Sequence, residues 1–142
     1  MSTIVEQIRE ERKLAGAPRV TALAAGYAEA AALAERYARA QLSLPAFALV
    51  WCAKAGGNEG ETWWWPDGRV EVCINAGADP SPRDVARVVL HECRHVADGE
   101  RFCAQWPQQT EKSAIDFSSF VMRELAPRDF DQLSGRRPSG RR

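Results

Sequence analysis

The sequence predicts a single α+β domain, and three patterns in the chain predict this fold class. Residues 19–42 are rich in alanine, with apolar side chains at near-helical spacing. Residues 61–75 alternate in polarity around a Pro-Asp-Gly turn, as in a β-hairpin. Residues 82–98 follow a helix-capping sequence. A chain of 142 residues favours one core, so we expect a single domain over residues 1–133, with an N-terminal helical part at residues 1–44.

The composition is that of a soluble globular protein, with 45% hydrophobic and 27% charged residues. The 19 basic and 19 acidic side chains give a formal net charge of zero, which disfavours a dedicated nucleic-acid binder. No apolar run is long enough to span a bilayer, so we expect no membrane association. The N-terminal stretch MSTIVEQIREERKL lacks the apolar region of a signal peptide. We therefore expect a cytoplasmic protein.

Two helices are expected before the first strand. Residues 3–15 form a short amphipathic pattern, with Ile4 and Ile8 on one face among Glu and Arg side chains. The longer alanine-rich helix over residues 19–42 ends before Pro45. We expect both helices to cover the core.

Residues 47–55 are apolar and contain aromatic and β-branched side chains, which predicts a strand. The hairpin follows, with one strand reaching Trp65 and a second over residues 69–75. Three adjacent tryptophans, residues 63–65, end the first of these strands, and alternating faces prevent all three from facing the core. We expect the helix at residues 19–42 to pack over their rings. The alternative is an exposed surface beside a cleft, where a peptide adds as a strand to the hairpin edge.

The four cysteines, Cys52, Cys73, Cys93 and Cys103, contain no C-x-x-C pair, so the sequence does not signal a cysteine zinc cluster. In a reducing cytoplasm we expect four buried or half-buried thiols. A bridge between Cys52 and Cys73 is the alternative if their strands pair.

The helix at residues 82–98 has a well-marked start and end. Ser81 can cap it, Pro82 suits the first helical position, Asp84 lies in the first turn and Gly99 follows the last turn.

The segment from Arg101 to Gln108 is expected to be irregular or a short helical turn. A last helix is expected over residues 110–125, and a disordered, solvated basic tail over residues 134–142.

The segment VVLHECRHVADGE contains both histidines of the chain, His91 and His95. Helical residues four apart share a face, so both imidazoles can reach one metal ion. Glu92 is rotated around the helix, within reach of a metal-bound water. This H-E-x-x-H pattern is typical of zinc hydrolases, because zinc lowers the pKa of its water and a carboxylate takes the proton. The plainer alternative is two polar side chains near a helix C-terminus.

A catalytic zinc ion needs a third protein ligand and an open position for water. The chain has no third histidine, which excludes the pattern H-E-x-x-H-x-x-G-x-x-H and leaves an acidic residue or a cysteine as third ligand. Asp98 and Glu100 are too near in the sequence to fold back easily. Glu111 starts the next helix, which an antiparallel pair would place opposite the first. We rank Glu111 first, Asp116 second and Cys103 third.

HECRH, followed after 15 residues by EKSAIDFSSFVM, resembles the gluzincin metallopeptidases, and most of all the compact bacterial and phage ImmA/IrrE-type proteins. The resemblance covers roughly residues 69–125. It implies a zincin-like domain, in which a short sheet supports the active-site helix and the following helix carries the last ligand. It also implies that His91, His95 and Glu111 bind Zn²⁺ and that Glu92 is the general base.

The chain departs from that group at two places. Gluzincins often have Asp or Asn four residues after the ligand glutamate, but this position is Ile115 and the acid follows at Asp116. No His or Tyr follows to stabilise the oxyanion. The remaining candidates for that role are Tyr27, Tyr37, Arg94 and Arg101.

The sequence therefore predicts a zinc-dependent metallopeptidase that hydrolyses a protein or peptide with a zinc-bound water activated by Glu92. The alternative is a zinc-binding regulatory or interaction module, phage or prophage encoded, that acts by contact without proteolysis. A DNA-associated zinc protease is a further alternative, disfavoured by the neutral charge and kept open by the arginine tail.

Overall fold

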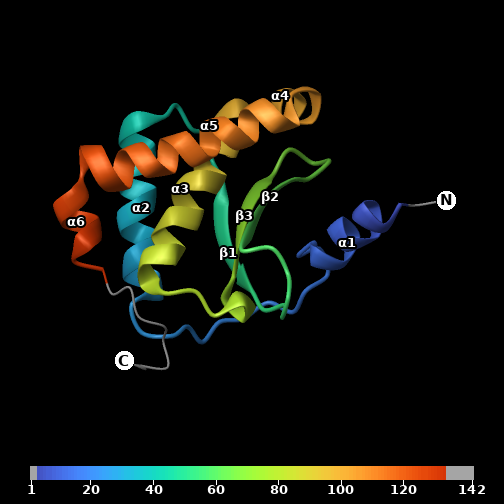
Figure 1. Cartoon of the computed structure of the whole chain (residues 1–142), viewed down its shortest axis with the longest axis horizontal. Helices are drawn as coiled ribbons and strands as arrows, with labels where there is room; N and C mark the ends of the chain where they lie inside the picture. The colour runs from blue at the N-terminus through green and yellow to red at the C-terminus, as the bar shows by residue number, and fades with distance from the viewer. Residues whose placement is uncertain (1–2, 134–142) are drawn as a thin grey trace.

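A computed structural model gives the structure of residues 3–133. In this range the chain has six α-helices and one three-stranded mixed sheet, which confirms the predicted α+β class (Figure 1). The tail over residues 134–142, expected to be disordered, lies outside the described residues. Within the described range, no helix combines the length and the apolar character needed to cross a membrane.

Figure 1 shows α3 between α2 and the sheet, with α5 crossing one end of α3 and α1 on the far side of the sheet. The α-helices are α1 (Ile4–Arg12), α2 (Tyr27–Gln41), α3 (Pro82–Asp98), α4 (Glu100–Gln105), α5 (Pro107–Phe120) and α6 (Pro127–Asp131). The strands are β1 (Ala48–Cys52), β2 (Gly60–Trp64) and β3 (Val70–Asn75). A 3-10 turn, η1 (Ala76–Ala78), follows β3, and a π-helical turn, η2 (Val121–Leu125), follows α5.

The sheet has the order β1-β3-β2, so the last strand in the chain is the central one. β3 pairs with β2 antiparallel and with β1 parallel. The predicted hairpin is confirmed, because Trp65 donates its main-chain N–H to the carbonyl of Arg69 at 2.9 Å. Gly68, with a φ of 92°, supplies the left-handed conformation that closes the turn. β2 is left at the sheet edge.

α3 is the central element of the fold, and its predicted bounds are confirmed. Ser81 and Asp84 form a reciprocal capping box, with the Ser81 hydroxyl accepting from the Asp84 N–H at 3.1 Å. Val85 and Val89 are fully buried on the face towards the core. The cap and the apolar face together fix the rotation of the helix, and therefore the direction in which its polar face points.

α2 begins at Tyr27, so the expected helix over residues 19–42 is too long at its start. Arg19 forms a β-bridge with Cys52 of β1, and Val20 donates to the carbonyl of Trp51 at 3.1 Å. This pairing overrides the helical propensity of the sequence. Gly26, with a φ of 88°, then turns the chain into the helix. As expected, α2 covers the core, with small buried side chains such as Ala34 in the apolar cluster.

The expected short helix at the N-terminus is present as α1, but the expectation that it covers the core is wrong. No residue of α1 is buried, and Ile4 is 74% exposed. The chain becomes anchored just after this helix, at the fully buried Leu14. There the Leu14 N–H donates to a carboxylate oxygen of Glu61 on β2 at 2.8 Å. α1 thus lies beside the sheet and contributes no buried side chain to the core.

The C-terminal part is more helical than the sequence predicts. Residues from Glu100 to Gln105 form the short helix α4, and α5 starts at Pro107, three residues before the expected start. The expected helix over residues 110–125 changes to π-helical geometry at Val121. α6 was not predicted; it returns the fully buried Phe130 to the core.

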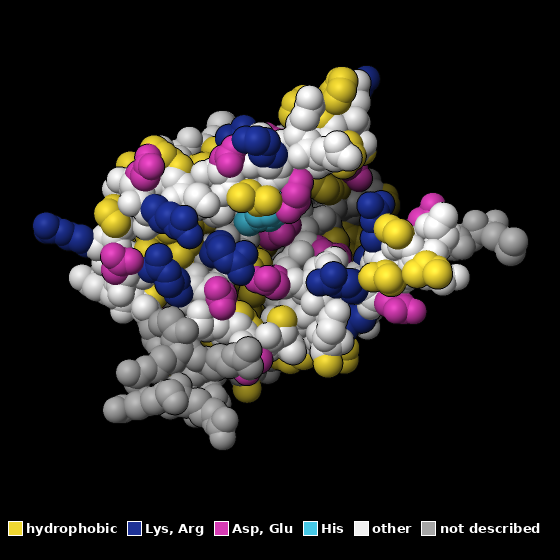
Figure 2. All heavy atoms as spheres, in the orientation of Figure 1, with side chains coloured by type: hydrophobic (Ala, Val, Ile, Leu, Met, Phe, Trp, Pro, Cys, Tyr) yellow, Lys and Arg dark blue, Asp and Glu magenta, His cyan; other side chains and the backbone are white. Residues whose placement is uncertain are grey.

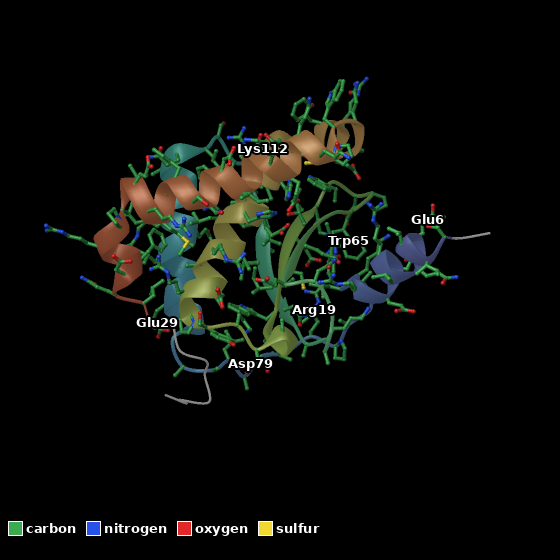
Figure 3. All side chains as sticks on the ribbon, in the orientation of Figure 1. Glu6, Arg19, Glu29, Trp65, Asp79 and Lys112 are labelled. Atoms are coloured by element: carbon green, nitrogen blue, oxygen red, sulfur yellow. The ribbon has the colours of Figure 1, made fainter. Side chains whose placement is uncertain are left out.

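The expectation that the helix at residues 19–42 packs over the three tryptophan rings is wrong. Tyr27 of α2 stacks instead on Trp51 of β1, with ring centroids 5.6 Å apart. Trp63 and Trp65 contact each other edge to face, and Arg19 of the extended segment lies 5.8 Å above the Trp63 ring. Figure 3 shows Arg19 and Trp65 on the side of the sheet away from α3.

All four cysteines are free thiols, three of them buried and Cys103 half-buried, as expected. The strands that carry Cys52 and Cys73 do pair, and the two sulfur atoms lie 2.9 Å apart.

Candidate metal centre

α3 presents both histidines on the face that is turned away from the buried valines. The rings of His91 and His95 lie one helical turn apart, with centroids separated by 4.9 Å. Their side chains are 16% and 14% exposed, so both are largely covered yet open on one side. The i, i+4 spacing therefore produces the shared direction that the sequence predicts.

α5 brings Glu111 to both histidines. One carboxylate oxygen lies 2.9 Å from the Nε2 atom of His91, and the other lies 3.2 Å from the Nε2 atom of His95. One ligand atom of each of the three residues lies within 4.8 Å of the other two. Figure 1 shows why they meet, since α5 crosses the end of α3 that carries the motif.

The other candidates for the third ligand lie elsewhere. Asp116 is exposed on α5 and pairs with Lys112 at 2.7 Å, on the outer side of the helix where Figure 3 labels Lys112. Cys103 of α4 faces the opposite side of the His95 ring, with its sulfur 3.7 Å from Nδ1. Glu100 is exposed at the start of α4. Of the sequence candidates, Glu111 is the one whose carboxylate lies close to both Nε2 atoms.

The charges in this cluster favour an ionised carboxylate. Hydrogen bonds from His91 and His95 hold the pKa of Glu111 well below its usual range. Burial lowers the pKa of His95, but the hydrogen bond to Glu111 and the nearby carboxylates outweigh it and raise the pKa overall. Two imidazole nitrogens and one carboxylate oxygen with an open side are the donor set that a catalytic zinc ion takes. The residues present therefore fit Zn²⁺.

Glu92 lies beside this donor set and is 7% exposed. Its carboxylate accepts a hydrogen bond from the Thr62 hydroxyl of β2 at 2.9 Å. Burial raises the pKa of Glu92 above its ordinary value. β2 packs closely against α3 at Gly60. Any side chain there would clash with α3, because a Cβ atom at Gly60 would lie 2.5 Å from Val88.

Thr62 is a site residue that the sequence reasoning missed. The only available signal was strand alternation, which puts Thr62 on the opposite face from Trp63. That signal does not say which helix covers the face.

Asp98 stands behind His95, on the last turn of α3. One of its oxygens accepts from Arg94 at 3.2 Å, and the other is buried without a hydrogen-bond partner among residues 3–133. An Asp98 oxygen lies within 4.8 Å of a ring nitrogen of His95 and of the Cys103 sulfur. Ile115, at the position where gluzincins often carry the histidine's acidic partner, is 50% exposed. Asp98 is therefore an acidic neighbour of His95 on the same helix.

The four residues considered for the oxyanion do not gather at the site. The buried Tyr27 hydroxyl donates to the carbonyl of Pro80 at 2.6 Å, and the Tyr37 hydroxyl donates to Asp129. Arg94 is held by Asp98. Arg101 is exposed on α4.

Comparison of the chain with known proteins gives no independent identification. No protein-family model, no curated protein and no solved structure matches it.

Proposed function

We propose that the protein is a zinc-dependent metallopeptidase in which His91, His95 and Glu111 hold Zn²⁺ and Glu92 is the general base. The observation that carries the proposal is the approach of Glu111 to both Nε2 atoms, at 2.9 and 3.2 Å. The buried Glu92 on the same helix supplies the second component that hydrolysis requires. The zincin-like fold belongs to this proposal.

When bound, zinc would polarise the scissile carbonyl and acidify the attacking water. Glu92 accepts a proton from that water as the water oxygen bonds to the carbonyl carbon. When the C–N bond breaks, Glu92 returns the proton to the leaving nitrogen. Burial, which raises the pKa of Glu92, makes its carboxylate a better base, and Thr62 holds it in place.

The edge strand supports a peptide as substrate. Among the described residues β2 pairs with β3 alone, so its outer edge has main-chain groups free for another strand. Thr62, in the middle of β2, contacts Glu92. An extended peptide added along this edge would therefore pass the general base and the metal ligands.

The interaction-module alternative also has one observation in its favour. Both tyrosine hydroxyls are engaged away from the site, so neither is free to stabilise an oxyanion. In that alternative the cluster binds zinc and the domain recognises a partner protein without cleaving it.

Metal analysis with an activity assay tests the proposal. Protein purified without a metal-affinity tag should contain about one zinc per chain, and His95→Ala should abolish this. The parent protein should cleave members of a mixed peptide library, whereas Glu92→Gln should keep zinc and lose at least about 100-fold in turnover. Zinc without cleavage would support the interaction module. Failure to take up zinc would reject both functions.

A further inference from the structure

Three neighbouring cavities lie along the surface that carries the metal-ligand cluster. The central one, of about 370 Å³, is lined by His91 and Glu111 together with Arg12 of α1 and Arg87 of α3. Arg12 also lines a cavity of about 500 Å³ beside α1, and Arg87 lines one of about 230 Å³ beside η2. Because neighbouring cavities share wall residues, we treat the three as one channel and name it the basic groove.

Basic side chains occur along the whole length of the basic groove, where, within the described part of the chain, six of them outnumber four acidic ones, Glu59, Glu61, Asp84 and Glu111. Figure 2 shows Lys and Arg side chains on both sides of the histidines, with Asp and Glu side chains among them, around a hollow in the surface. The chain as a whole has a net charge of zero, so this excess is local. The basic side chains that line the groove are Arg9, Arg12 and Lys13 at the α1 end, Arg87 in the centre, and Arg83 and Arg123 at the η2 end.

Several of these guanidinium groups are available to a ligand. Within residues 3–133, Arg9, Arg12 and Arg123 take part in no ion pair, although Arg87 pairs with Glu59 and Arg83 with Asp131. The free groups thus stand at both ends of the groove, on either side of the metal ligands. A guanidinium group binds a carboxylate through two parallel N–H donors, which makes carboxylates its favoured partners.

The walls of the basic groove favour an acidic peptide over a nucleic acid. The cavities are lined by no Trp, Tyr or Phe of the described residues, so the groove lacks the platforms on which single-stranded bases stack. Gly60 and Thr62 of the edge strand do line it, and they offer main-chain pairing to an extended chain.

We infer that the basic groove selects peptide segments with Asp or Glu side chains on both sides of the bond that lies at the metal ligands. This inference deepens the proposed function and depends on it for the position of the cleaved bond. Arg9 and Arg12 bind the carboxylates on one side, and Arg123 binds those on the other. Val5 and Ile8, which line the same α1 end, add an apolar contact.

Binding without turnover tests the inference separately from catalysis. Zinc-loaded Glu92→Gln protein is titrated into three fluorescein-labelled twelve-residue peptides, and the anisotropy is followed. The first is rich in Asp and Glu, the second has Asn and Gln at the same positions, and the third has Lys there. The acidic peptide should bind at least about tenfold more tightly than its amide counterpart at low salt, and the preference should shrink as salt rises.

Arginine variants identify the groups responsible. Arg12→Gln and Arg123→Gln in the Glu92→Gln background should each weaken the acidic peptide about threefold to tenfold and leave the amide peptide unchanged. Arg36→Gln, at an exposed arginine on α2 outside the groove, is the matched control. All variants keep the zinc ligands, so any carboxylate bound directly to the metal contributes equally to each.

Equal affinity for the acidic and amide peptides would overturn the inference. So would a single-stranded oligonucleotide that displaces the acidic peptide at a lower concentration than the unlabelled peptide does. Neither result would contradict the proposed function, because that function is tested by zinc content and by peptide cleavage in the parent protein.

Discussion

The hydroxyl group of Thr62 donates to the carboxylate of Glu92 at 2.9 Å, between residues 30 positions apart in the sequence. The same hydroxyl lies 3.2 Å from the main-chain oxygen of Glu92. This contact joins the edge strand β2 to α3. In the proposed function, the strand that receives a peptide therefore also orients the general base.

Replacement of Thr62 by valine preserves the shape of the side chain and removes the donor. We expect Thr62→Val to retain zinc and to lose about tenfold in kcat, because Glu92 loses its orienting hydrogen bond. Steady-state peptidase kinetics with metal analysis measures both quantities. Thr62→Ser, which keeps the hydroxyl, should recover most of the rate. Parental kcat in the valine variant would show that Glu92 needs no support from β2.

Glu111 and Asp116, two acidic residues of α5, allow a test of the third zinc ligand together with a matched control. Glu111→Gln should lower zinc affinity at least about 100-fold, because the amide carries no charge to offset the metal. Asp116→Asn removes the same charge from an exposed position five residues later and should leave zinc binding unchanged. Competition with a fluorescent zinc chelator gives both affinities. The reverse ranking would transfer the ligand role to Asp116.

Asp98 allows a test of whether its carboxylate orients His95 as a zinc ligand. A carboxylate close to a histidine ligand can fix the orientation of the ring and raise its basicity, and an Asp98 oxygen lies within 4.8 Å of a ring nitrogen of His95. We therefore expect Asp98→Asn to weaken zinc binding about 10-fold to 100-fold without unfolding the protein. Glu100→Gln, an equal loss of charge at an exposed neighbour, is the control. Equal zinc affinities for the two variants would leave Asp98 a purely structural partner of Arg94.

The buried Glu71 should give the fold an acid-sensitive contribution to stability. Its side chain is 11% exposed and accepts from Arg19 at 3.1 Å and from Trp65 at 2.8 Å. Burial raises the pKa of Glu71, but these two donors and the charges of Arg19 and Arg69 outweigh it and lower the pKa below the ordinary value of 4.5. Since the folded-state pKa is the lower one, the contribution is present above 4.5 and is lost as the pH falls through the folded-state value.

We expect Glu71→Gln to be less stable than the parent by about 2 kcal/mol at pH 6, and we expect this difference to narrow below pH 4. Urea unfolding between pH 6 and pH 3 measures it. Glu29→Gln, at an exposed glutamate of α2, should show little difference at either pH. A difference that stays constant over the whole range would mean that the Glu71 charge is not what stabilises the fold.

The predictable parts of this protein depend on short-range rules. The Ser81 cap, the Pro82 start and the Gly99 end define α3 from a few neighbouring residues. The i, i+4 spacing within that helix then directs His91 and His95 together. Glu111 was ranked first by assuming an antiparallel helix pair, and α5 does bring it to the histidines.

The contacts that sequence reasoning missed join distant segments. The start of α2 was misplaced because residues such as Val20 pair with β1, and helix propensity carries no information about that partner. Thr62 was missed because its role depends on β2 packing against α3. The exposure of α1 was missed because Ile4 and Ile8 give an amphipathic pattern whether or not a surface covers them.

The strand order carries a consequence for synthesis on the ribosome. β1 cannot join the sheet until β3 has emerged, because its partner in the β1-β3-β2 order is the last strand of the chain. The hairpin of β2 and β3 is local and can form first, and β1 then docks on it. Glu111 emerges later still, on α5. The nascent chain therefore exposes Trp51 and its β1 neighbours before their partner arrives, and Glu111 can reach His91 and His95 only when nearly the whole domain is available to fold.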